Sequence, residues 1–361
     1  LLQNADDLFF CKTIALHSLV LSMGQSLLQN GLFQRGKVTI DKDKHAIQTY
    51  QKNFPEVNAL HMDVADFEPV DLGVNARDLI LFGGPPCQGF STSNRRIRGP
   101  ENSKNWMFKD FLKLVSHYSP AATVVENVSG IKEGINKPIF EDMIQSLKHL
   151  GYHVNVLTLR SDHFGVPQKR TRVFTIGTKK HVELRYNEFH STGATVKDAL
   201  LDLPSLPNGH AIDEVDYASE AHSAYAEELR GALRRCGNHF VTNNASHIVE
   251  RFRHVPQGGN WKSIPRDLLA NYKDLTSCHT GIYRRLTWQE PSIVIGNFRK
   301  NMLIHPDQDR GLSVREAARL QSFPDNFSFL GSIGKQQQQV GNAVPPKLAF
   351  AVMSTIKRAL A

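Results

Sequence analysis

The stretch that decides the fold is a short apolar strand that runs directly into a rigid loop: residues 78–91 read DLILFGGPPCQGFS. The glycines allow a tight turn and the prolines fix backbone angles, so this loop can hold the thiol of Cys87 in one place. A lone cysteine is more often a small buried apolar side chain than a reactive group. By itself the loop therefore predicts the end of a strand and leaves the chemistry of Cys87 open.

Strand and helix patterns alternate on both sides of this loop as far as residue 177. Short apolar runs predict strands over residues 37–40, 122–125, 154–159 and 172–176, and periodic segments predict helices over 45–53, 108–115 and 139–150. Short strands separated by helices are typical of a parallel sheet that helices cover on both faces. In such sheets, ligands bind beyond the ends of the strands.

The pattern changes after Gly177. Residues 178–311 carry many turn residues and few periodic segments, which predicts a second, smaller and irregular domain. A helix is predicted over 313–323, because Ser313 and Glu316 have the spacing of a capping box, and a last helix over 347–361. The glutamine tract 336–339 is too short to act as a low-complexity segment. We therefore expect a main domain over 1–177, a second domain over 178–311, and residues 312–361 returning to the first.

Composition narrows the class of protein. Of the 361 residues 40% are hydrophobic, which excludes a disordered chain, and the net charge of +8 favours an acidic partner such as nucleic acid. The four cysteines are scattered without metal-binding spacing, so we expect neither disulfides nor a zinc site, and a reducing cytoplasm as the compartment. No apolar run approaches the roughly 20 residues that cross a membrane.

Five sequence elements, in order, resemble the motifs of the cytosine-C5 DNA methyltransferases of bacterial restriction-modification type. They are the loop around Cys87, residues 126–128 (ENV), 168–172 (QKRTR), 315–324 (REAARLQSFP) and 339–346 (QVGNAVPP). Each element has modest specificity, but five in the family's order are a strong signal. The resemblance implies a Rossmann-like α/β sheet that uses S-adenosylmethionine, with a smaller irregular domain that recognises double-stranded DNA.

The resemblance also implies catalytic roles. Carbon 5 of cytosine is a poor nucleophile, and addition of the Cys87 thiolate at carbon 6 makes it enamine-like, so that it can attack an activated methyl group. Glu126 would bind ring nitrogen 3 and the exocyclic amine. Arg170 and Arg172 are candidates for the positive charge that favours the thiolate and for holding the base, with their division of labour left open. A solvated surface position is the alternative for Glu126, and a solvated strand edge or a phosphate contact is the alternative for the two arginines. The chemistry implies no metal.

The target atom lies inside the duplex, so the nucleotide must be flipped out. The basic loop after Cys87 could close over DNA, and we expect DNA contacts from Ser91, Arg95, Arg96, Arg98 and Gln168. Residues 178–311 occupy the place of the family's target-recognition region, with 247–261 and 280–285 as the best candidates for groove contacts. Trp261 and Trp288 are more often core residues. We expect a monomer, with a cognate restriction endonuclease as a possible partner.

The cofactor site departs from the family pattern. The family's first strand usually ends in DLFxGxGG, whereas Asp7-Leu8-Phe9 is followed here by a segment without those glycines. Glycines let the backbone approach a ligand closely, so we expect S-adenosylmethionine to bind weakly. Other positions match the family, and they are Phe9, Asp41, Asp63, Val64, Pro85, Asn342 and Val344. Asp41 and Asp63 could also be simple caps at strand ends, and Asn342 a turn residue.

Several alternatives stay open. The altered segment fits an inactive homologue, an altered or mis-assigned N-terminal sequence, or a working variant with a rebuilt loop. The protein could also be a sequence-specific DNA-binding homologue that has lost catalysis, or a methyltransferase acting on cytosine in RNA.

Overall fold

The computed structural model describes residues 38–84, 108–191, 193–270, 280–296 and 298–361. Within them the chain forms two compact units. The first unit contains the residues up to Phe164, Thr171–His190 and Ala343–Ala361, and the second contains Gly165–Arg170 and Ser191–Asn342. The chain therefore passes between the units four times.

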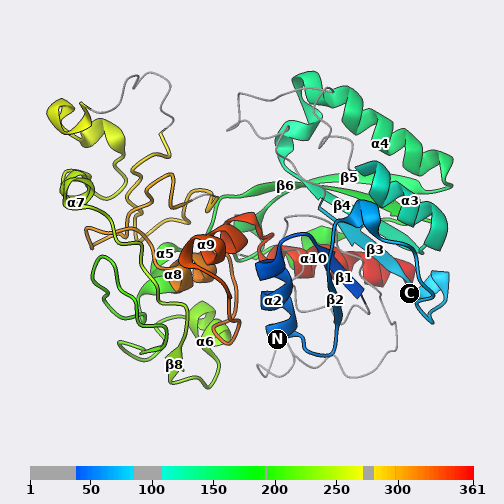
Figure 1. The fold of residues 1–361 in the computed structure, drawn as a ribbon. Coiled ribbons are helices and arrows are strands. Elements are labelled where there is room, and N and C mark those ends of the chain that lie inside the picture. The colour runs from blue at the N-terminus through cyan, green and yellow to red at the C-terminus, as the bar shows by residue number, and fades with distance from the viewer. Residues whose placement is uncertain (1–37, 85–107, 192, 271–279, 297) are drawn as a thin grey trace. The chain divides into compact units, whose positions relative to one another are not determined.

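The first unit is built on a mixed sheet (Figure 1). Strand β3 (Ile80–Gly83) pairs in parallel with β4 (Ala122–Asn127), and β6 (Thr171–Thr178) lies antiparallel to both β4 and β5 (His153–Arg160). A separate parallel pair consists of β1 (Val38–Asp41) and β2 (Asn58–His61), which are joined by α2 (Lys44–Asn53). The α/β fold that the sequence predicts is confirmed, and the sheet is mixed because β6 runs antiparallel to both of its neighbours.

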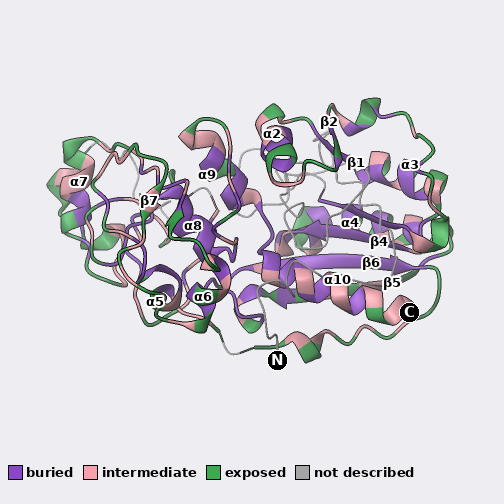
Figure 2. Cartoon of the chain, turned by 90° about the horizontal axis from the view of Figure 1, so that it is seen from below, coloured by how far each residue is buried: buried purple, intermediate pink, exposed green. Residues whose placement is uncertain are grey.

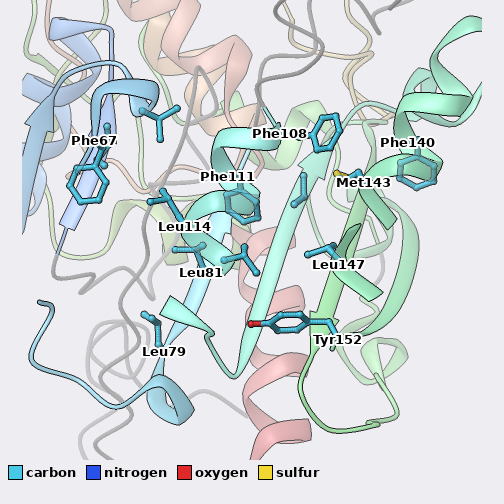
Figure 3. Close-up of a cluster of buried hydrophobic side chains, with 14 of the residues drawn as sticks. Phe67, Leu79, Leu81, Phe108, Phe111, Leu114, Phe140, Met143, Leu147 and Tyr152 are labelled. Carbon is cyan, nitrogen blue, oxygen red and sulfur yellow. The ribbon is translucent and has the colours of Figure 1, made fainter. Parts of the chain in front are cut away.

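Helices cover both faces of the sheet of β3, β4, β6 and β5. On one face α3 (Phe108–Tyr118) and α4 (Lys137–His149) pack on Leu81 and Val125, and on the other α10 (Pro346–Leu360) packs on Phe82 and Val124. Neighbouring residues on a strand face opposite sides, which explains this division. Figure 3 shows side chains of the hydrophobic cluster between the sheet and the helices α3 and α4. Strands β4 and β6 are buried along most of their length (Figure 2).

The second unit has short elements and long irregular connections. Its helices and strands are α5 (Val196–Leu200), β7 (Val215–Asp216), α6 (Ala224–Arg230), β8 (Arg235–Cys236), α7 (Ser246–Arg253), α8 (Val314–Leu320) and α9 (Ile333–Asn342). Single 3₁₀ turns lie in both units at Val64–Asp66, Ala76–Asp78, Ser129–Lys132, Gly134–Asn136, Ser161–His163, Tyr186–Phe189, Trp261–Ser263 and Arg266–Leu269. No described helix is long and apolar enough to cross a membrane.

Two features of the C-terminal region could not be read from the sequence. The capping box of Ser313 and Glu316 is present, but α8 ends at Leu320 and not at residue 323. The glutamine tract lies within α9, where Gln336, Gln337 and Gln339 are buried and donate hydrogen bonds to other parts of the second unit. Contacts place the whole segment up to Asn342 in the second unit, whereas the sequence placed its boundary at residue 311.

Buried arginines hold the second unit together. Arg319 is fully buried and forms ion pairs with Asp202 at 2.7 Å and Asp325 at 2.6 Å. Arg310 pairs with Glu316 at 2.7 Å, and these charges hold the pKa of Glu316 down to about 2, against the opposing effect of burial. Because the unit has few regular elements, these side chains supply the cross-links that a sheet would otherwise provide.

Replacing Arg319 tests this role. Arg319→Leu leaves Asp202 and Asp325 buried without their main positive partner, so we expect a loss of about 3–5 kcal/mol in unfolding free energy. The exposed ion pair of Arg253 with Glu250 is the control, and Arg253→Ala should cost less than about 1 kcal/mol. Urea denaturation measures both. Equal losses in the two variants would contradict the interpretation.

The stability of the protein should also depend on pH. Burial lowers the pKa of His239 and His305 to about 4, so both are neutral in the folded state where an unfolded histidine would take up a proton. The contribution of each histidine to the unfolding free energy is therefore fully present above about pH 6.5. It falls by up to about 3 kcal/mol per histidine as the pH decreases to about 4, because the unfolded chain takes up the proton first.

Denaturation at several pH values between 4 and 7 measures this slope. His239→Gln and His305→Gln should each flatten it, and His247→Gln, at an exposed position, should not. A parent profile that is flat over this range would disprove the prediction.

Candidate active site

Glu126 and Arg172 form an ion pair on the sheet of the first unit. Glu126 lies opposite Phe174 in the antiparallel pairing of β4 and β6, and Arg172 is two residues before Phe174 on β6. All three side chains therefore project from one face of the sheet, and a diagonal neighbour with a long side chain is within reach. Arg172 Nε lies 2.6 Å from Glu126 Oε1, and both side chains are about nine-tenths buried. Two charges that are removed from water compensate each other there.

The loop that contains Cys87 begins beside this pair. In the parallel pairing of β3 with β4, Gly83 lies opposite Val125, so Gly84 leaves the sheet at the same edge as Glu126. Cys87 itself lies outside the described residues. The same holds for the other predicted site residues of this loop and of the N-terminal segment, namely Phe9, Pro85, Ser91, Arg95, Arg96 and Arg98.

Arg170 lies in a different setting from Arg172. Its guanidinium donates to the carbonyl oxygen of Ile295 at 3.0 Å and to that of Gly341 at 2.9 Å, and only 1% of the residue is exposed. The structure thus brings Arg172 to Glu126, but it places the guanidinium of Arg170 among backbone carbonyls of the second unit.

Gln168, predicted to contact DNA, is also fully buried in the second unit. Its amide nitrogen donates to Gln321 Oε1 at 2.9 Å, and its amide oxygen accepts from the backbone N–H of Ile295 at 2.8 Å. Both ends of this side chain are therefore bound within the protein.

A second polar edge lies at the ends of β1 and β2. Asp41 and His61 are paired at the ends of these parallel strands, and Asp63 follows two residues later. Each aspartate is a local cap, because Asp41 accepts from the Asp43 N–H at 2.7 Å and Asp63 from the Ala65 N–H at 3.1 Å. Burial nevertheless raises the pKa of Asp41 to about 6, so further hydrogen-bond donors would stabilise its charged form. Ribose hydroxyls are donors of this kind.

The remaining cofactor candidates differ in exposure. Val64 is buried beside Asp63, and Asn342 is half-buried at the last position of α9. Val344 packs in the hydrophobic cluster between the sheet and α10, which accounts for its apolar side chain. Within the described residues, no three acidic, cysteine or histidine side chains are grouped as a metal site.

The predicted groove contacts in the second unit divide into exposed and structural residues. Arg253 and His254 are exposed, whereas Arg285 is buried and binds the carbonyl oxygens of Phe252 and Val255 at the end of α7. Arg285 is therefore a structural residue. Trp261 packs on the hydrophobic cluster of this region, as the sequence suggested.

Comparison with known proteins identifies the family. The family model of the C-5 cytosine-specific DNA methylases matches residues 23–358. The chain is 32% identical to the type II methyltransferase M.DdeI of Desulfomicrobium norvegicum, over 88% of this chain and 82% of that protein. It is 34% identical to M1.HphI of Haemophilus parahaemolyticus, over 88% and 80%.

Solved structures show the same fold. A protein described as a DNA modification methyltransferase encoded within an E. coli prophage superposes with a TM-score of 0.74 at 24% identity, over 95% of this chain and 99% of that one. The S. pombe Dnmt2 methyltransferase superposes with a TM-score of 0.55 at 15% identity, over 94% and 98%. The chain therefore belongs to the C-5 cytosine-specific DNA methylase family, the DNA (cytosine-5-)-methyltransferases.

Proposed function

We propose that this protein transfers a methyl group from S-adenosylmethionine to carbon 5 of a flipped-out cytosine, with Cys87 as nucleophile. The observation that carries the proposal is the ion pair of Glu126 with Arg172, at the edge of the sheet where the loop to Cys87 begins. A carboxylate held in place by a guanidinium suits the two adjacent polar positions of a cytosine ring. The family's reaction needs this combination of a thiol, a carboxyl group and a positive charge.

The residues of this chain divide the work of the reaction. The Cys87 thiolate adds to carbon 6, and Glu126 binds the exocyclic amine and shares a proton with ring nitrogen 3. Arg172 keeps the Glu126 carboxylate oriented and supplies positive charge beside the base. A base removes the proton of carbon 5 after methyl transfer, and elimination then releases the thiol.

The edge formed by β1 and β2 suits S-adenosylmethionine. Asp41 would accept hydrogen bonds from the ribose hydroxyls, and Asp63 with Val64 would flank the adenine. Asn342, Phe9 and Pro85 are further candidates for this pocket. When bound, the cofactor supplies the activated methyl group.

The second unit is the candidate target-recognition region, with the first unit carrying the catalytic residues. The basic loop after Cys87 would contact DNA phosphates. Relatives such as M.DdeI and M1.HphI are type II methyltransferases, which supports a role in restriction-modification alongside an endonuclease of the same specificity. We propose that the enzyme acts as a monomer in the cytoplasm.

A covalent trap tests the nucleophile. The parent protein, S-adenosylmethionine and duplex DNA carrying 5-fluorocytosine should form a covalent complex, because fluorine at carbon 5 blocks the final elimination. Cys87→Ser should form none, and Glu126→Gln should trap at least about a hundredfold more slowly. Gel electrophoresis in denaturant measures each complex.

Cys236 provides the matched control for this experiment. Burial raises the pKa of its thiol to about 11, so it stays protonated and Cys236→Ser should trap like the parent. If the protein binds the DNA but forms no covalent complex with it, it is a DNA-binding homologue without catalysis. If it forms the complex with RNA and not with DNA, its substrate is cytosine in RNA.

A calorimetric titration with S-adenosylmethionine tests the site at the ends of β1 and β2, around Asp41 and Asp63, which we name the cofactor edge. Because the glycine-rich turn is missing, we expect S-adenosylmethionine to bind more weakly than about 100 μM, a free energy smaller than about 5.5 kcal/mol in magnitude. Ribose hydroxyls favour the charged form of Asp41, so affinity should rise between pH 5 and pH 7, and Asp41→Asn should abolish that rise. A micromolar dissociation constant would disprove the prediction of weak affinity. An affinity that does not change with pH would disprove the role of Asp41.

A further inference from the structure

Arg170 and Gly341 lie close to two of the points where the chain passes between the units. Gly165–Arg170 belongs to the second unit and Thr171 starts β6 in the first, while Asn342 is the last residue of the second unit before Ala343. Each crossing lies next to a candidate functional residue. Arg172 is two residues after the crossing at Arg170, and Asn342 is the last residue before the other crossing.

The guanidinium of Arg170 joins these two points within the second unit. It donates to Gly341 at the end of α9 and to Ile295 in the loop facing it, at 2.9 and 3.0 Å. A planar guanidinium with donors on separate nitrogens can bind two carbonyl groups at once, which the single ammonium of a lysine does less well.

The spacing of the two carbonyl groups is fixed by close backbone packing. A Cβ atom on Gly341 would lie 2.1 Å from the carbonyl oxygen of Gly296, so only glycine allows α9 to end this close to the loop. Gln321 links the same region to the end of α9, because its amide nitrogen donates to the carbonyl oxygen of Val340 at 2.7 Å. Gln168 in turn hydrogen-bonds to both Gln321 and Ile295. Arg170 thus completes a buried network, which we name the crossover clamp: Gln168, Arg170, Ile295, Gln321 and Gly341.

We propose that Arg170 is a positioning residue that fixes, through the crossover clamp, the two chain segments leading to Arg172 and to Asn342–Val344. The inference rests on the proposed function, in which Arg172 holds Glu126. The two arginines of the QKRTR element then have different roles. Arg172 contacts the base, and Arg170 fixes the start of β6, the strand that carries Arg172. Because Arg170 donates to two carbonyl groups and is almost wholly buried, we assign it a role in positioning and none in contacting the base or the thiolate.

Four variants test this division. Arg170→Met fills a similar volume but removes both hydrogen bonds, and Arg170→Lys restores a charge that can reach one carbonyl. Lys169→Met is the matched control, because the neighbouring Lys169 is exposed and pairs with Glu290 at the surface. Arg172→Met provides the comparison for loss of a catalytic charge.

The first measurement is the rate of trapping on 5-fluorocytosine DNA as a function of pH. A misplacement of about 1 Å can cost about a hundredfold in rate, so we expect a loss of that order for Arg170→Met, with an unchanged pH profile and DNA affinity. Arg170→Lys should recover part of the rate, and Lys169→Met should match the parent. Arg172→Met should shift the profile to higher pH, because it removes positive charge from beside the thiolate. A shift of the same kind for Arg170→Met, or a parent-like rate, would overturn the proposal.

The second measurement does not depend on activity. In the free protein, Arg170→Met should accelerate hydrogen exchange at Ile295, at residues 340–344 and at the start of β6, but not at Thr175–Thr178 in the middle of the sheet. Unchanged exchange at these positions would refute the clamp even in an active enzyme. If the parent traps no DNA at all, the proposed function fails, and the exchange data still decide whether Arg170 holds the two segments.

Discussion

The register between β4 and β6 is the constraint on which the active site depends. Glu126 and Arg172 meet only because both side chains leave the same face of the sheet, and a slip of one residue would turn Arg172 to the opposite face. The register is fixed by the neighbours of this pair, since Phe174 and Ile176 of β6 pack under α10 beside Val124 of β4. Apolar packing thus determines where the charges of Glu126 and Arg172 lie, and removal of either would leave the other buried without its partner in the ion pair.

The second unit solves the problem of stability differently. Its irregular segments leave many carbonyl groups without a partner in a helix or sheet, and a buried carbonyl must be satisfied. Arg285, Arg315 and Arg319 meet this need: Arg285 caps α7, Arg315 donates to the carbonyls of Gly237 and Phe327, and Arg319 joins acidic and carbonyl groups of distant segments. These buried arginines therefore serve the fold, and under the proposed function only exposed positive charge in this unit would attract DNA.

This double use of arginine limits what the sequence could predict. Periodicity placed most strands and helices of the first unit within a few residues but did not predict β2, and Ser313 with Glu316 fixed the start of α8, because these signals are local. The motifs also singled out Glu126 and Arg172, but not the ion pair that they form with each other. Whether an arginine faces a ligand or a carbonyl depends on segments far apart in the chain. Arg170 binds residues more than a hundred positions away, and the buried glutamines of α9 likewise looked like a polar tract.

The cofactor edge shows why a departure from a motif does not affect a whole site equally. The family model matches from residue 23, so Asp7-Leu8-Phe9 lies outside the match, while Asp41 at the end of β1 and Asp63, two residues past the end of β2, lie within it. A glycine turn contributes close approach of the backbone, which no side chain can replace. Asp41 contributes a buried carboxyl group, and burial raises its pKa to about 6. These are separate contributions to binding, so the ribose end of a ligand can still be recognised where the contacts made by the turn are lost.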